Sequence, residues 1–321
     1  MSVQLTRSLG IPPGPESGPA SPWNLGGLSL PTLARRVYHE IDEDEIFDRA
    51  AALAYYFLFA LFPTLLFLTT LFGMLPVPGL IDRMMAYLQD VLPGDSASMM
   101  QKTLGEIVRG ARGRLLSIGA LAALWAASAG VSSMISALDI TYEVSDPRPW
   151  WRRRLLAIGL TLALSLLALV AMVLLVFGGT IGSLLGNRIG FGGVAVAIWN
   201  VVQWPVAVFC VVFGVALVYY TAPAVRQRWY WITPGSLFAT FAWVTMSIGL
   251  RLYVEYFGNY NATYGSIGGV ILLLLWLYLT SAVLLIGAEI NSEIEAAAAR
   301  RGAETAKAAG ERVDPRARRS A

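Results

Sequence analysis

The side chains that most often carry out protein chemistry are scarce in this sequence of 321 residues. It has one histidine, His39, and one cysteine, Cys210. A zinc site built from His and Cys ligands, or a catalytic triad with a histidine base, needs more than these two residues offer. Cys210 lies within a long apolar run, where cysteine behaves as a small hydrophobe. We therefore expect no catalytic site, no metal site and no cofactor.

Carboxylates offer another route to chemistry, and they are dense just before the first long apolar run. The acids in this patch are Asp42, Glu43, Asp44, Glu45 and Asp48. Such oxygens suit a hard metal cation. Because successive residues point in different directions around a helix, the preferred interpretation is a solvated acidic cap, with a cation site as the alternative.

A second group of acids follows the last apolar run. Glu289 lies in the segment 287–291, and Glu293 and Glu295 come soon after it. An ionisable group inside a membrane is costly and is usually kept there for a function. Glu289 is therefore a candidate functional carboxylate, with the interfacial end of a helix as the alternative interpretation.

The elements that must position these residues follow from the composition. The chain is 56% hydrophobic and 14% charged, whereas soluble domains carry about 25% charged residues. A soluble globule needs a charged shell, a disordered chain needs low hydrophobicity and a coiled coil needs abundant charge, so composition argues against all three. The remaining class is a protein that crosses a membrane several times.

Six windows of the chain contain no Asp, Glu, Lys or Arg and exceed the roughly 20 residues that a helix needs to cross a bilayer. Their apolar runs are continuous, unlike the alternating pattern of barrel strands, so we predict an all-α polytopic fold. Trimmed at Gly and Pro, the predicted spans are about 50–74, 116–138, 156–184, 197–221, 231–251 and 268–289.

Basic residues are distributed unevenly between the two sides of this topology. Seventeen Lys and Arg residues fall on the side of both termini and seven on the other side. Because cytoplasmic segments carry an excess of Lys and Arg, both termini are predicted to be cytoplasmic. Five of the seven lie between the first two spans, where apolar residues at helical spacing predict amphipathic interfacial helices.

One membrane domain, residues 31–295, is expected to contain all six spans. Residues 1–30 are rich in Pro, Gly and Ser and lack the apolar region of a signal peptide. They predict a flexible tail that stays on the mature chain. Residues 296–321 predict a basic cytoplasmic tail.

Polar groups and a proline near or within the spans are the candidates for a cavity or a gate. A proline removes a backbone hydrogen bond and can kink a span, which suits conformational gating. The candidate residues are Tyr55, Tyr56, Pro63, Ser132, Tyr142, Glu143, Glu289 and Asn291.

Arginines and tryptophans are concentrated in the second connection. Arg148, Arg152, Arg153 and Arg154 lie beside Trp150 and Trp151. Cations and amphipathic rings at the inner headgroup level could contact anionic lipid heads. The alternative is a plain interfacial anchor without a specific ligand.

Three stretches of the chain share the pattern of one known family. Residues 49–63 have an Ala-rich start, paired aromatics and a proline. Residues 138–154 contain Asp139 and Glu143, followed by the Pro, Trp and Arg residues. Residues 275–291 end on the second acidic segment. In this order, over about 35–300, they resemble the bacterial YihY/BrkB family. Asp139, where Asn is more frequent, and Ala60, where Ser is common, depart from that pattern.

The resemblance implies a six-span protein of the bacterial inner membrane. Members were long labelled ribonuclease BN, but RNA cleavage would need metal ligands or an acid–base pair on a soluble, basic surface, so we expect no nucleic-acid partner. Other members are described as serum-resistance factors or linked to export of envelope lipids. Membrane lipids are the expected partners, no protein partner is specified, and a homo-oligomer is compatible with the sequence.

These implications favour a translocator of a lipid or an amphipathic envelope component. A non-transporting scaffold in envelope assembly is the alternative, because the spans lack an ionisable group at mid-depth. A membrane-embedded enzyme using Glu143 and Glu289 is the least favoured hypothesis.

Overall fold

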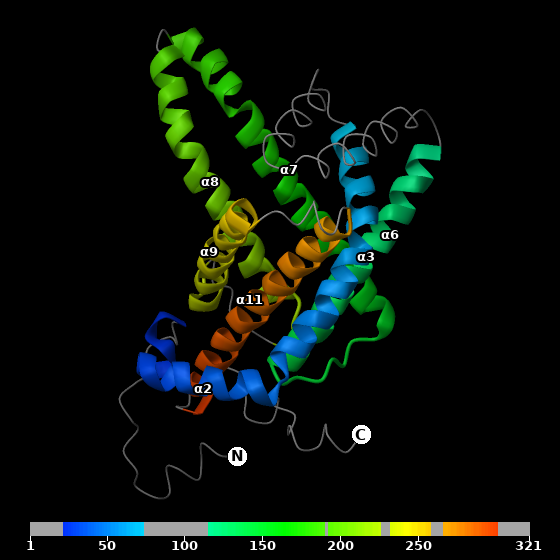
Figure 1. The fold of residues 1–321 in the computed structure, drawn as a ribbon, viewed down its shortest axis with the longest axis vertical. Helices are drawn as coiled ribbons and strands as arrows, with labels where there is room; N and C mark the ends of the chain where they lie inside the picture. The colour runs from blue at the N-terminus through cyan, green and yellow to red at the C-terminus, as the bar shows by residue number, and fades with distance from the viewer. Residues whose placement is uncertain (1–21, 74–114, 190–191, 226–231, 258–265, 301–321) are drawn as a thin grey trace, which may run out of the picture.

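The computed structural model describes residues 22–73, 115–189, 192–225, 232–257 and 266–300, and these form helices without any strand (Figure 1). A short 3-10 helix comes first, followed by seven α-helices within the described residues. Their bounds are η1 (Pro22–Gly27), α2 (Leu30–Glu43), α3 (Ile46–Gly73), α6 (Leu115–Thr141), α7 (Trp150–Ile189), α8 (Gly192–Thr221), α9 (Pro234–Phe257) and α11 (Ser266–Arg300).

Six of these helices are long and apolar enough to cross a membrane, namely α3, α6, α7, α8, α9 and α11. The all-α, six-span fold class predicted from the sequence is therefore confirmed. Several helices extend beyond their predicted spans: α7 begins at Trp150, and α11 continues to Arg300. Charged residues end an apolar window, but Arg and Glu are good helix formers and do not end a helix. The amphipathic helices predicted between the first two spans lie outside the described residues.

The N-terminal part of the described chain packs on the bundle. Gly26, in η1, lies so close to α11 that a Cβ atom there would be 2.8 Å from the Cβ atom of Ala297. Leu25 and Leu28 pack against a small apolar cluster that includes Ile294 of α11. Residues 22–30 of the predicted tail therefore pack on the bundle, because Leu25 and Leu28 have an apolar surface to cover; residues 1–21 of that tail lie outside the described part.

Helix α2 lies across one end of the bundle (Figure 1). Ser29 caps it, since the Ser29 hydroxyl oxygen accepts a hydrogen bond of 3.4 Å from the backbone N–H of Thr32. Leu33 and Val37 are buried against Ile294 of α11. We call this end of the bundle the α2 end; α3 and α7 begin there, and α6 and α11 finish there.

Helix α11 runs through the middle of the bundle and packs against α3, α9 and α6 (Figure 1). The main apolar core contains small side chains of α11, including Ala282 and Ala288. Gly235 of α9 meets Gly287 of α11 so closely that a Cβ atom at Gly235 would overlap the Gly287 carbonyl oxygen. Small residues at this crossing let two helices approach closely, as in other membrane bundles.

Large apolar side chains also cover the outer sides of the spans. Those exposed over more than half of their surface include Phe62, Leu121, Val201, Trp204 and Phe241. In water such a surface would drive aggregation, whereas lipid chains are its natural neighbours. The exposed apolar surface is therefore consistent with a bundle that sits in a bilayer.

Candidate functional site

The chain turns sharply between α6 and α7, and this turn positions most of the candidate polar residues. The N–H of Glu143 donates to the Ile140 carbonyl at 2.7 Å, and the N–H of Val144 donates to the Asp139 carbonyl at 2.9 Å. Glu143 adopts a φ of 50°, in the left-handed region that commonly ends a helix. The turn leads into Asp146 and Arg148, immediately before α7.

Arg148 joins three separate segments. Its Nε donates to Asp146 Oδ1 at 2.7 Å, and its Nη2 donates to the carbonyl oxygen of Ala222, after α8, at 2.9 Å. The same Nη2 lies 3.6 Å from Oδ1 of Asp139 on α6, which also accepts from the N–H of Ala224 at 2.7 Å. This guanidinium therefore connects the ends of α6 and α8 with the turn before α7.

Arg153 and Arg154 lie on the first turn of α7 and reach towards α6. Arg153 Nη2 donates to the Ser136 hydroxyl and, at 3.4 Å, to the Ser132 carbonyl. The Arg154 guanidinium lies 4.1 Å above the ring of Trp125 and donates to that residue's carbonyl oxygen. Within the described chain, the buried Nε atoms of both arginines have no hydrogen-bond acceptor.

A pocket of about 560 Å³ opens between α6 and α7 at this point. We call it the α6–α7 pocket; it is lined by Ala129, Ser132, Ser133, Ser136, Asp146, Arg148, Trp150, Arg153 and Arg154. Three guanidinium groups and three serine hydroxyls face one carboxylate, so the lining carries an excess of positive charge. Such a lining favours an oxygen-rich anion.

The one carboxylate of the pocket is held in its ionised form. Burial alone would raise the pKa of Asp146, but hydrogen bonds from the side chain and the backbone of Arg148, with the charges of Arg148 and Arg153, hold its pKa below the ordinary value. Asp146 thus serves Arg148 as a counter-ion. Of the four arginines predicted to contact lipid heads, Arg148, Arg153 and Arg154 line the pocket, whereas Arg152 stacks 5.1 Å from the Trp151 ring.

Carboxylates from distant parts of the sequence gather at the α2 end. Glu289 and Glu293 of α11 are each 2% exposed, and Glu143 is 9% exposed. The negative charges of Asp44, Glu40, Glu293 and Glu143 all act on Glu289. The candidates Glu143 and Glu289 therefore lie at the same end of the bundle as three acids that were not candidate site residues, close enough for their charges to act on Glu289.

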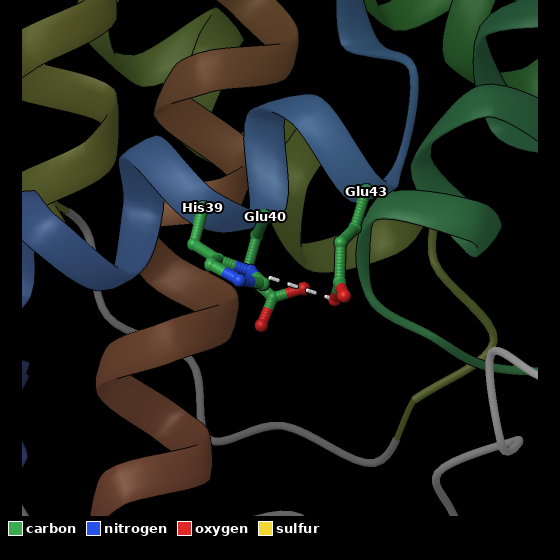
Figure 2. Close-up of side chains that lie close together, drawn as sticks. All are labelled: His39, Glu40 and Glu43. Carbon is green, nitrogen blue, oxygen red and sulfur yellow. Dashed lines mark ion pairs between the residues drawn. The ribbon is translucent and has the colours of Figure 1, made fainter.

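Glu40 stands between this buried group and the solvent. Burial, together with the negative charges of Glu143, Glu293, Glu43 and Asp44, raises the pKa of Glu40 to about 7. On its outer side, Glu40 lies with His39 and Glu43, whose ligand atoms are all within 4.8 Å of one another (Figure 2). His39 Nδ1 and Glu43 Oε2 are 3.7 Å apart.

The sequence of α2 contains a pattern that indicates which of its acids face the bundle. Leu33, Val37, Glu40 and Asp44 follow one another at spacings of four, three and four. They therefore share one helix face, and the two leading residues of that face are apolar and buried. This spacing places Glu40 and Asp44 on the packed side of the helix, where both are half-buried, whereas Asp42, Glu43, Glu45 and Asp48 are exposed, as expected for a solvated acidic cap.

Two further candidate residues, Asn291 and Tyr142, lie away from the pocket. Asn291 ties the start of α9 to α11, since its Oδ1 accepts from the N–H of Gly235 at 3.0 Å and its Nδ2 donates to the Thr233 hydroxyl at 3.0 Å. Tyr142 is fully buried in the apolar core. Neither residue lines the α6–α7 pocket.

Tyr55 and Tyr56 lie on the outer surface of α3, where they are 56% and 49% exposed. The helix turns Ala50, Leu53 and Ala54 towards the core instead. Pro63 lies within α3 and does not end it. The structure does not bring these three candidates to the pocket, because α3 packs through its small and aliphatic residues.

The fold and site together define an α-helical membrane protein with six candidate spans, a basic pocket on its side and an acidic cluster at one end. The chain matches the virulence factor BrkB family over residues 37–311. It belongs to that family.

Relatives of the chain are bacterial proteins. It is 35% identical to the ribonuclease-like protein YfkH of Bacillus subtilis over 245 residues, which are 76% of this chain and 88% of that protein. It is 26% identical to a UPF0761 membrane protein of Stenotrophomonas maltophilia over 83% of this chain, and 26% identical to one of Xanthomonas campestris over the same share. The chain spans 61% of the length of each of these two relatives. No solved structure matches the chain.

Proposed function

We propose that this protein binds an anionic lipid at the α6–α7 pocket and translocates a lipid or an amphipathic envelope component. The pocket carries the proposal, because three arginines and three serines face a single aspartate there. We place the protein in the bacterial inner membrane with both termini in the cytoplasm. The excess of Lys and Arg on the side of the termini supports this orientation.

The arginines of the pocket differ in how much hydrogen-bonding capacity remains for a ligand. Arg148 is engaged by Asp146, by the Ala222 carbonyl and, at a longer distance, by Asp139. Arg153 Nε lies 3.9 Å from Asp146 Oδ2, beyond hydrogen-bond distance, and in the described part of the chain the buried Nε atoms of Arg153 and Arg154 have no hydrogen-bond acceptor. A phosphate group supplies several acceptor oxygens and pairs well with guanidinium groups. Arg153 and Arg154 are therefore the proposed contacts of an anionic headgroup.

The surroundings of the pocket suit a lipid rather than a free anion. Trp125 and Trp150 flank the arginines, and such rings prefer the level of the headgroups. Exposed apolar side chains such as Leu121 on α6 and Leu155 on α7 continue the surface beyond the pocket. They can contact the acyl chains of a lipid whose head is held by the arginines.

The alternative function, a non-transporting scaffold, is favoured by the apolar interior. A second pocket, of about 280 Å³, lies between α7 and α8 and is lined by residues such as Leu164, Cys210 and Val218. A third, of about 190 Å³, is bounded by Trp243 and Trp276 among mainly apolar neighbours. Such cavities offer little to a polar headgroup crossing the bundle.

We propose no enzymatic activity for this chain. The ribonuclease-like name belongs to the Bacillus relative. Here the supporting observation is that Glu143 and Glu289, the carboxylates considered for an enzymatic role, are buried among helices, where a polynucleotide has no access.

A reconstitution experiment tests the proposal. Purified protein is placed in liposomes that contain labelled phosphatidylglycerol or labelled phosphatidylethanolamine, and the transfer of each label between leaflets is measured. Arg153→Gln removes one of the three arginine charges that line the pocket, whereas Arg251→Gln removes an exposed arginine on α9 as a matched control. We expect the wild type and the control to move lipid and Arg153→Gln to lose most of the activity towards the anionic lipid.

Two results would contradict this function. If the wild type moves neither lipid, the scaffold alternative is favoured. If Arg153→Gln retains full activity while the wild type is active, transport does not use the α6–α7 pocket.

A further inference from the structure

A large side chain, Tyr219, bridges α8 and α11. Within the described residues, α8 packs on α7 and on α9, and its backbone makes no comparable contact with α11. Tyr219 is 2% exposed, and its hydroxyl group donates to the Leu284 carbonyl oxygen of α11 at 2.6 Å. The connected ends of α7 and α8 lie well away from α11 (Figure 1).

The residues that precede Tyr219 on the same face of α8 are too short to continue this bridge. Val211 and Val215 come before Tyr219 at spacings of four, so the three side chains share one helix face. A valine side chain reaches much less far than a tyrosine side chain. Space therefore remains between α8 and α11 beside the two valines.

Two cavities occupy this space. The larger, of about 280 Å³, lies on the side of α7, and the smaller, of about 190 Å³, lies on the side of α9. Val211, Val215 and Leu284 line both cavities, which are therefore neighbours. We call the two cavities, joined at these three residues, the α8–α11 groove.

The hydroxyl and indole N–H groups of the groove already have hydrogen-bond partners. The Thr240 hydroxyl donates to a backbone carbonyl of its own helix at 2.8 Å. The Thr280 hydroxyl accepts from Trp243 Nε1 at 3.2 Å, and Trp276 Nε1 donates to the Ser247 hydroxyl at 3.1 Å. Water therefore finds few partners here, and apolar cavities of about 150 Å³ are known to stay dry and to take up apolar molecules instead.

The groove opens to the outer surface of the spans. Every helix that lines it is a candidate span. At its mouth, Ala168 of α7 and Val211 of α8 are exposed, whereas Gly214 and Val218 are buried further in. In a bilayer, such an opening meets the hydrocarbon chains of the lipids.

We propose that the α8–α11 groove binds a hydrocarbon chain of a membrane phospholipid, lodged beside Val211 and Val215. A flexible, unbranched chain can follow the irregular space on either side of the valines. It supplies the dispersion contacts that an empty cavity lacks. The groove shares no lining residue with the α6–α7 pocket, so this site does not depend on the function proposed above.

The bound chain would act as a wedge between α11 and the pair formed by α7 and α8. Tyr219 fixes the distance between α8 and α11 at one end of the groove. Beyond that point the lipid chain would provide the packing that the valines do not reach. A phospholipid would therefore be part of the folded structure, and its chain would stabilise the position of the α7–α8 pair.

Photocrosslinking of the full-length protein in phosphatidylcholine liposomes tests this proposal. The probe is phosphatidylcholine with a diazirine on one acyl chain, added as a small fraction of the lipid, and crosslinked residues are mapped by mass spectrometry. We expect crosslinks at Cys210, Gly214 and Leu167 of the groove to be enriched over those at outer residues such as Phe241, which is 73% exposed. A diazirine-labelled free fatty acid and a diazirine-labelled sterol are used in parallel.

Two substitutions and one control locate the chain. Val215→Phe places a ring in the proposed path, and groove crosslinks should fall at least about fivefold, because two groups cannot share one close-packed volume. Val211→Phe, at the exposed mouth, should act in the same direction and does not depend on the tolerance of the interior. Val202→Phe introduces the same ring on the opposite face of α8 from Val211, where the side chain is 40% exposed, and should leave the groove crosslinks unchanged. The Tm of each variant confirms that it is folded.

Three results would overturn the proposal. The first is crosslinking of the phospholipid probe in proportion to exposure over all the spans, without enrichment in the groove. The second is enrichment that both Val215→Phe and Val211→Phe leave unchanged. The third is groove crosslinking by the fatty acid or the sterol probe alone, which would show that the groove excludes phospholipid chains.

Discussion

Arg148 provides the most direct test of how the α2 end is held together. Replacing it with Met keeps most of the side-chain volume and removes the guanidinium that connects α6, α8 and the turn before α7. The loss includes the 2.7 Å hydrogen bond to Asp146 and the 2.9 Å hydrogen bond to the Ala222 carbonyl. It also leaves Asp139, whose side chain is 7% exposed, without its nearby cation.

The expected magnitude follows from this geometry. Removing one partner of a buried ion pair costs about 3–5 kcal/mol. The side chain of Arg148 is 22% exposed, so water offsets part of the cost and about 3 kcal/mol is the better figure. A loss of this size should lower the apparent Tm by at least about 5 °C.

The assay is thermal unfolding in lipid-free detergent, followed by tryptophan fluorescence. Asp146→Asn and the double variant, which carries both Arg148→Met and Asp146→Asn, complete a double-mutant cycle. The coupling energy between Arg148 and Asp146 should exceed about 1 kcal/mol. Arg251→Met, at an exposed position of α9, should change stability by less than about 0.5 kcal/mol. The structural role of Arg148 would be refuted if Arg148→Met had the same Tm as the wild type, or if it lost stability only when anionic lipid is added. Either result would favour the prediction that Arg148 contacts an anionic headgroup.

Three further predictions concern packing, a helix connection and pH. Gly235→Ala should cost at least about 2 kcal/mol of stability because its Cβ atom would overlap the Gly287 carbonyl. The control Gly249→Ala, whose Cβ atom would have nothing within 4 Å, should be neutral or stabilising by up to about 1 kcal/mol. Equal Tm values for these two variants would contradict the close approach of α9 and α11. Asn291→Ala should lose about 1 kcal/mol, measured by thermal unfolding, because the N–H of Gly235 loses its acceptor. The folded state lowers the pKa of Asp146, so its contribution is present above the unfolded pKa of about 4 and is lost as pH falls through the folded pKa. Unfolding midpoints of Asp146→Asn should therefore depend less on pH below about 4 than those of the wild type, and parallel curves would contradict this assignment.

The spans were predictable because each depends on local composition. A run of apolar residues needs no distant partner to be recognised, and six such runs correspond to the six helices that can cross a membrane. Helix ends were less predictable. Arg154 and Glu289 bound apolar windows, yet both lie inside long helices, because a charged side chain changes where a helix meets water and not whether it is a helix.

The candidate site was predictable only in part. Arg153, Arg154 and Ser132 share one pocket, since the arginines begin α7 and the turn folds α7 back along α6. Tyr55 and Tyr56 lie elsewhere, on the outer face of α3. A span that is apolar on every side gives no periodic signal for the face that it buries.

The sequence by itself determined the class of protein, the number of spans and the excess of basic residues on the side of the termini, because hydropathy and charge are summed along the chain. Only the tertiary structure decided which polar groups meet. Asn291 of α11 accepts from the N–H of Gly235, 56 residues away, and Arg148 reaches the carbonyl of Ala222, 74 residues away. Such encounters depend on how helices are rotated and crossed, and packing between distant residues sets that rotation.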